Sequence, residues 1–71
     1  MTNKLKMFRV MANLKQQELA ELVSVSRQTI IAIEAGKYVP STMLSLKLAF
    51  ALKVSIDELF QLEDSDWAKI K

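Results

Sequence analysis

Residues 25–36, VSRQTIIAIEAG, predict a short helix with a start signal at one end and a stop signal at the other. Ser26 suits the N-cap because its hydroxyl can accept a hydrogen bond from the free amides of the first turn. Gly36 suits the end, since glycine adopts the left-handed conformation at no steric cost. Ile30 and Ile33 are three residues apart and share one face, so we expect them in the core.

The other face of this helix is mostly polar and is called the reading face below. It carries Arg27, Gln28, Ile31 and Ala35, with Thr29 at its edge. Arginine and glutamine can each make paired hydrogen bonds to a base edge, and a bare apolar side chain can meet the methyl group of thymine. We therefore expect base contacts from Arg27, Gln28 and Ile31, with Thr29 as a further contact.

The preceding residues 16–23, QQELAELV, predict a second helix joined to the first by a tight turn. Leu19, Ala20, Leu22 and Val23 form its apolar side. A small alanine lets two helices cross closely, and an apolar residue just after the turn completes the packing of a helix-turn-helix. The expected buried positions across both helices are Leu19, Ala20, Val23, Val25, Ile30 and Ile33.

The stretch QQELAELVSVSRQTIIAIEAGKYVPS resembles the lambda-repressor/Cro family in its Xre-type branch. The similarity extends over about residues 5–60. It implies an all-α, five-helix fold, closed by a short C-terminal strand from residues 60–63 near the N-terminus. Residues 1–71 then form one domain, in which the helix-turn-helix occupies residues 16–35 and a C-terminal extension residues 61–71.

The resemblance and the helix positions also suggest which residues surround the reading face. The family commonly has a phosphate-contacting glutamine at the place of Gln16. The expected phosphate contacts are Lys15, Gln16, Gln17, Lys37 and Tyr38, although a loop tyrosine is about as often a packing residue. The resemblance further implies an ion pair between Arg9 and Glu34 that holds the reading helix. The alternative is two solvated charges.

Three positions depart from the family pattern. Asn13 replaces a glycine between the first two helices and is a reasonable left-handed substitute. Lys15 stands where the family has Ser or Thr, and its side chain cannot accept a bond from the helix amides. Ser24 occupies a turn position that tends toward positive φ, at a cost of roughly 1–2 kcal/mol for a residue with a Cβ.

Composition narrows the functional class. The 71 residues include one Gly, one Pro, no Cys and no His, so one helical domain is expected, without disulfides or cysteine metal sites. The usual general base is absent, and no nucleophile with a partner base or glycine-rich phosphate loop is visible. We therefore expect no enzyme and no cofactor. No apolar run is long enough to cross a membrane, and the N-terminus does not resemble a signal peptide, so a cytoplasmic location is expected.

The charges are unevenly spread along the chain. Residues 1–56 carry eight Lys and Arg against three Glu, a net charge of +5, whereas residues 57–71 carry two Lys against five Asp and Glu, a net charge of −3. A basic body suits a polyanion, and the acidic end should point away from it. An ordinary mixed surface would give similar counts.

Helices are also expected over residues 4–12, 42–53 and 56–60. The first should bury Leu5, Phe8 and either Met11 or Ala12. Residues 61–66 alternate partly, which suggests a short strand, and residues 67–71 are expected to be loose.

Residues 42–53 are too apolar for a surface helix with one buried face. One stripe, expected in the core, holds Ser45, Leu48, Ala49 and Leu52. A second apolar stripe holds Met43, Leu46 and Phe50. It must be covered either within the monomer, by the C-terminal residues through Trp67, or by a partner. The expected homodimer interface consists of Met43, Leu46, Phe50, Ile56 and Phe60.

These observations predict a sequence-specific regulator of double-stranded DNA, a repressor that binds an inverted repeat as a homodimer. The alternative is a protein-interaction module on the same fold, such as an antitoxin that acts through a protein partner. The sequence shows no small-molecule ligand and no membrane partner.

Overall fold

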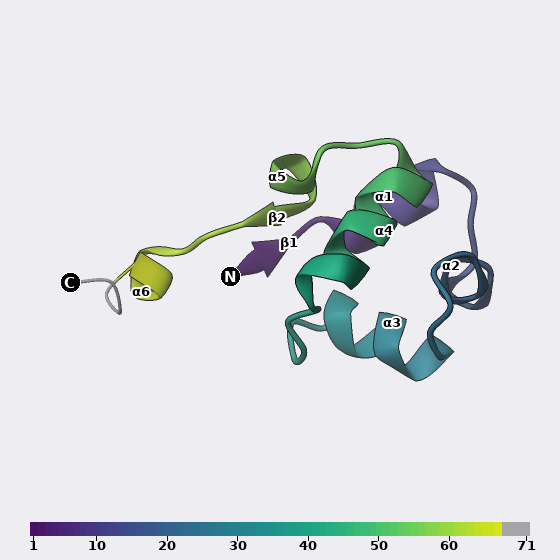
Figure 1. The fold of residues 1–71 in the computed structure, drawn as a ribbon, viewed down its shortest axis with the longest axis horizontal. Coiled ribbons are helices and arrows are strands. Elements are labelled where there is room, and N and C mark those ends of the chain that lie inside the picture. The colour runs from purple at the N-terminus through teal and green to yellow at the C-terminus, as the bar shows by residue number, and fades with distance from the viewer. Residues whose placement is uncertain (68–71) are drawn as a thin grey trace.

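The computed structural model describes residues 1–67 (Figure 1). Along the chain the elements are β1 (Thr2–Asn3), α1 (Leu5–Met11), α2 (Gln16–Leu22), α3 (Arg27–Glu34), α4 (Thr42–Leu52), α5 (Ile56–Leu59), β2 (Phe60–Gln61) and α6 (Asp64–Trp67). The predominantly helical fold predicted from the sequence is confirmed. The described residues contain one helix more than the five expected.

The core lies where α1, α2, α3 and α4 meet, and α5 closes it. Its buried apolar side chains are Leu5, Leu19, Ala20, Val23, Ile30, Ile33, Leu44, Leu48, Ala49, Leu52 and Leu59. The buried positions predicted for the helix-turn-helix are confirmed, except that Val25 is only half-buried against this core. Leu44 joins the stripe of α4 that was expected to be buried.

The predictions for the apolar faces of α1 and α2 were partly wrong. Met11 and Ala12 at the end of α1 are exposed, and Leu22 at the end of α2 is 61% exposed. In α1 the buried neighbour of Leu5 and Phe8 is Arg9, because its charge is neutralised by an internal partner. A periodicity count based on apolar residues does not anticipate a buried arginine.

The two ends of the chain pair in a small antiparallel sheet. Thr2 of β1 lies opposite Gln61 of β2, and Asn3 lies opposite Phe60. The Lys4 amide adds a bond of 2.9 Å to the Leu59 carbonyl. The expected C-terminal strand near the N-terminus is therefore present, but it is two residues long, and Phe60 belongs to it instead of to the fifth helix.

After β2 the chain forms α6 instead of the strand expected over residues 61–66. The Asp66 carboxylate accepts a bond from the Glu63 amide at 2.8 Å, which closes a helical turn. The Met1 ammonium lies 2.8 Å from Glu63 and 2.9 Å from Asp66, and these two carboxylates raise its pKa. Trp67 belongs to α6 and is therefore not loose as expected, and residues 68–71 lie outside the described part of the chain.

Serine caps begin three of the helices, and the cap predicted at Ser26 is confirmed. The hydroxyls of Ser26, Ser41 and Ser55 each accept from the amide three residues later at 3.2 Å. Lys15 at the start of α2 provides no such side-chain cap, as expected for a lysine. Instead, the Glu18 carboxylate accepts from the Lys15 amide at 2.8 Å, which supplies half of a capping box.

The four longer helices all end in the same hydrogen-bonded turn. A residue with positive φ follows each helix, namely Asn13, Ser24, Gly36 and Lys53. The next amide in each case bonds back five residues, as from Leu14 to Arg9 and from Val25 to Ala20. This is the Schellman arrangement, which satisfies helix carbonyls that would otherwise be free. The left-handed conformations expected at Asn13, Ser24 and Gly36 are confirmed.

Ser24→Gly should stabilise the fold, because Ser24 has φ of 60° in a region that disfavours a Cβ. We expect the free energy of unfolding to rise by about 0.5–1 kcal/mol, and the melting temperature by several degrees. Gly36→Ala is the matched control. Its φ is 74° and no atom lies within 4 Å of an added Cβ, so backbone strain alone should lower stability. Thermal melts of both variants would contradict this account if the two changes shifted stability in the same direction.

Candidate nucleic-acid interface

Helix α3 places one face in the core and leaves the other open. Ile30 and Ile33 are fully buried, whereas Arg27 and Gln28 are exposed and Ile31 is half-buried. Figure 1 shows α3 along the lower edge of the molecule, with α2 beside it and α4 above it. The side chains chosen from the helical wheel therefore lie on one outward surface.

The first residues of α2 and α3 form the walls of a hollow. It has a volume of about 520 Å³ and is lined by Arg9, Lys15, Gln16, Gln17 and Arg27. The fold thus brings together the first residue of the reading helix and three predicted phosphate contacts. Among residues 1–67, no acidic side chain lines this hollow.

A buried ion pair forms the inner side of the same region. Arg9 Nε lies 2.6 Å from Glu34 Oε2, and the two side chains are only 10% and 6% exposed. Arg9 Nη1 also donates to the Leu14 carbonyl at 2.8 Å. The Arg9–Glu34 contact that the resemblance implied is therefore present, and it ties α1 and the following loop to the end of α3.

No signal in the sequence indicated that Gln16 would join the Arg9–Glu34 pair. Its Nε2 donates to Glu34 Oε1 at 3.1 Å, so a residue expected only at the DNA backbone also contacts the buried carboxylate. The side chain keeps its carbonyl oxygen and a second amide proton for another partner. Its neighbour Gln17 instead donates to Glu21 at 3.2 Å along the exposed side of α2.

Thr29 lies at the start of α3 but takes part in its cap. Its hydroxyl is 3.1 Å from the hydroxyl of Ser26, and the residue is half-buried. A hydroxyl that already has a local partner is less suited to recognising a base edge. The wheel position alone did not reveal this local bond.

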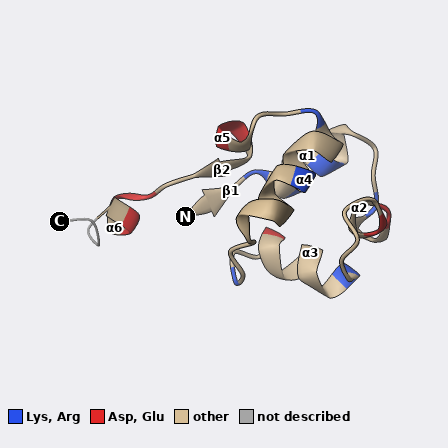
Figure 2. Ribbon diagram, viewed as in Figure 1, with Lys and Arg blue, Asp and Glu red and all other residues tan. Residues whose placement is uncertain are grey.

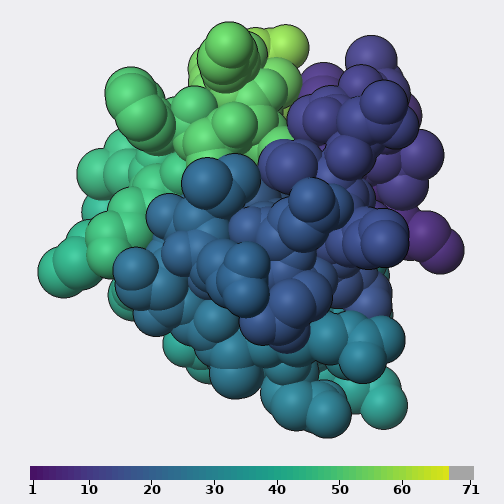
Figure 3. All heavy atoms as spheres, turned by 90° about the vertical axis from the view of Figure 1, so that its right-hand side faces the viewer, coloured from purple at the N-terminus to yellow at the C-terminus, as the bar shows by residue number. Residues whose placement is uncertain are grey.

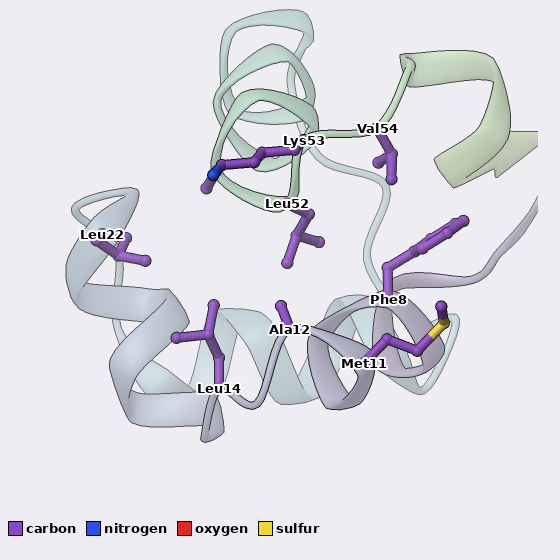
Figure 4. Close-up of a pocket in the computed structure, with 9 residues that line it drawn as sticks. Phe8, Met11, Ala12, Leu14, Leu22, Leu52, Lys53 and Val54 are labelled. Carbon is purple, nitrogen blue, oxygen red and sulfur yellow. The ribbon is translucent and has the colours of Figure 1, made fainter.

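Basic residues occur at both ends of α3 (Figure 2). Lys37 and Tyr38 lie in the loop after α3, where both are exposed. Within residues 1–67, Lys15, Arg27 and Lys37 have no acidic partner in an ion pair. Figure 2 also shows the acidic residues of α5 and α6 on the side of the molecule away from the start of α3.

Two classes of site are not found in the described part of the chain. Residues 1–67 contain no group of three or more acidic, histidine or cysteine side chains that could hold a metal ion. No helix in this range is long and apolar enough to cross a membrane.

Two packed helices, a tight turn and an outward face with cations at both ends define a DNA-binding helix-turn-helix domain. The helix-turn-helix family model matches residues 5–59. The chain belongs to this family, in its lambda-repressor-like, Xre-type branch of transcriptional regulators.

Relatives of similar length support the assignment. The chain is 52% identical over 66 residues to an uncharacterised HTH-type transcriptional regulator of Methanocaldococcus jannaschii. This alignment covers 93% of this chain and 100% of the relative. It is 42% identical over 66 residues to an uncharacterised HTH-type regulator of Bacillus subtilis, with the same two coverages.

Solved structures share the fold. The restriction-modification controller protein of Aeromonas hydrophila aligns with a TM-score of 0.73 at 36% identity, covering 79% of this chain and 85% of that one. A chain from the structure of the SinR protein/SinI protein complex aligns with a TM-score of 0.76 at 28% identity. The alignment covers 94% of this chain and 70% of that one.

Proposed function

We propose that this protein is a sequence-specific repressor that binds an inverted-repeat DNA operator as a homodimer. The observation that carries the proposal is the composition of the exposed face of α3. Gln28 and Ile31 lie on this face, and cations that have no acidic ion-pair partner among residues 1–67 lie at both ends of α3. Such a face suits base recognition in the major groove, with the phosphate backbone held on either side.

The phosphate contacts divide into two groups. Lys15, Gln16 and Gln17 lie at the start of α2, and Lys37 and Tyr38 lie beyond the other end of α3. These side chains interact with a backbone that is the same for every sequence, so they supply affinity and orientation. The acidic residues of α5 and α6 lie away from this surface, where they repel the DNA least.

The dimer proposal rests on an apolar patch formed by Met43, Leu46 and Phe50 of α4. These side chains are 67%, 55% and 87% exposed, so residues 1–67 do not cover them within the monomer. The alternative cover by a C-terminal segment through Trp67 is therefore wrong for the described residues. A patch of this kind on a small protein favours association, and a two-fold axis lets the same surface cover itself.

The other predicted interface residues differ from one another. Ile56 is 38% exposed, so part of its side chain is available to a partner. Phe60 is half-buried against the core, so it has less surface to offer a partner. Leu22, which was placed on the apolar side of its helix, borders a hollow of about 780 Å³ that is also lined by Met43, Leu46 and Phe50.

The same patch supports the second candidate function, a protein-interaction module. One of the similar solved structures is a complex of the SinR and SinI proteins, in which a protein of this fold is found with another protein. Under this alternative the α4 patch would bind a different chain, and the face of α3 would have no role in recognition.

Selection of bound duplexes from a random pool tests the proposal. We expect an inverted repeat whose half-site centres are roughly 34 Å apart, as a two-fold dimer requires. Each neutralised phosphate should add about −0.9 to the slope of log K against log salt. A promoter that carries the selected site should be less active when the protein is present. Recovery of no consensus, together with a flat salt response, would contradict the DNA-binding proposal and favour the interaction module.

A further inference from the structure

Arg27 occupies a different environment from Gln28, its neighbour on α3. Arg27 lines the hollow between the starts of α2 and α3, together with Arg9, Lys15, Gln16 and Gln17, whereas Gln28 does not. Both Arg27 and Lys15 are exposed and have no acidic partner within residues 1–67. The first side chain of the reading helix is thus part of a cationic hollow shared with α2.

We propose that this hollow holds one backbone phosphate of the operator, and that Arg27 binds this phosphate instead of reading a base. The proposal rests on the proposed DNA-binding function and assigns Arg27 a different role from the one the helical wheel suggested. A guanidinium presents two parallel N–H groups that match the oxygens of a phosphate. Lys15 adds a second positive charge from the opposite wall.

The inner wall of the hollow is fixed before DNA binds. Gln16 is held at 3.1 Å by Glu34, and Arg9 is held by the same carboxylate and by the Leu14 carbonyl. Because Glu34 neutralises Arg9, the free positive charge of the hollow comes from Lys15 and Arg27. A site whose walls are already ordered loses less entropy when it binds its ligand.

This assignment changes which residues determine the sequence of the operator. Base recognition falls to Gln28 and Ile31, which lie further along the exposed face of α3. Arg27 instead fixes where α3 begins relative to the DNA backbone, because phosphate contacts set register and orientation. Its removal should therefore weaken binding without changing the preferred sequence.

The test combines protein variants with single neutral methylphosphonates placed along the selected operator. At one position the methylphosphonate should weaken wild-type binding by about tenfold or more, and should have a clearly smaller effect on Arg27→Ala, because that variant has already lost the Arg27 contact and only the contact from Lys15 remains to be removed. Arg27→Ala should weaken binding to matched and base-substituted operators alike, and should reduce the steepness of the salt slope by about 0.9. Arg27→Lys, which keeps the charge but loses the paired donors, should lie between Arg27→Ala and wild type.

Two variants serve as matched controls. Gln28→Ala should lower the preference for particular bases and keep the sensitivity to the methylphosphonate. Lys37→Ala should weaken all sequences uniformly and also keep that sensitivity, since its phosphate lies at the other end of α3. Circular dichroism on each variant checks the fold, which these exposed positions should not disturb.

Relaxed discrimination at one base pair in Arg27→Ala, with the full methylphosphonate effect retained, would show that Arg27 reads a base and would overturn the inference alone. The DNA-binding proposal would survive that result, because wild type would still prefer its operator. Absence of specific duplex binding by wild-type protein would overturn both.

Discussion

Phe50→Lys should produce a folded monomer whose affinity for a full operator is about 100-fold lower than that of wild type. Phe50 is 87% exposed, so its replacement should leave the monomer fold nearly unchanged. A lysine at the centre of the proposed interface would instead have to lose its water when two copies associate, which is costly for an unpaired charge. Affinity for a single half-site should change little, because that contact uses one copy.

Sedimentation measures the association state, and binding titrations on full and half operators measure the two affinities. Val10→Lys is the matched control, since Val10 is 57% exposed on α1 and the variant has the same added charge. It should remain a dimer and bind the full operator. The dimer proposal fails if wild-type protein sediments as a monomer at tens of micromolar, a rough range for a weak dimer. It also fails if Phe50→Lys associates as wild type does.

Local signals predicted α3 well because its ends and its buried face are determined by a few adjacent residues. Ser26 caps the helix, Gly36 ends it with positive φ, and Ile30 and Ile33 fill the core. The same reasoning found the left-handed conformations of Asn13 and Ser24. It did not find the one at Lys53, because lysine carries no sequence signal for positive φ.

Predictions from local sequence patterns failed where a polar contact determined the structure. The apolar pattern of residues 4–12 did not predict the burial of Arg9, because that burial depends on Glu34, 25 residues away in sequence, and only the family resemblance implied this ion pair. The turn of α6 depends on the bond from the Glu63 amide to Asp66, in a segment whose partial alternation favoured a strand. Pattern counts include neither kind of contact.

In the candidate site, too, local patterns predicted single residues, whereas contacts between helices were missed. A helical wheel placed Gln28 and Ile31 on the outward face correctly, since α3 is regular. The hollow that contains Arg27 depends on how closely the start of α2 approaches α3, and the bond from Gln16 to Glu34 depends on the same approach. Because relative helix position comes from packing across the core, the sequence of α3 alone could not predict either feature.

Glu34→Ala should lower the free energy of unfolding by about 3–5 kcal/mol, the usual cost of removing one member of a buried ion pair. The variant leaves the guanidinium of Arg9 only 10% exposed and without its carboxylate. It also removes the acceptor of Gln16, so α1, α2 and α3 lose a shared contact.

Urea titrations of four proteins isolate this effect. Glu21→Ala is the control for loss of an exposed glutamate on a helix, and it should change stability by no more than about 0.5 kcal/mol. The double variant Arg9→Met with Glu34→Leu removes both charges and should lose less stability than Glu34→Ala alone, because no unpaired charge remains buried. If Glu34→Ala matched Glu21→Ala, the ion pair would not hold the reading helix in place. If the double variant were less stable than Glu34→Ala, the loss would come from packing at these positions and not from the unpaired arginine.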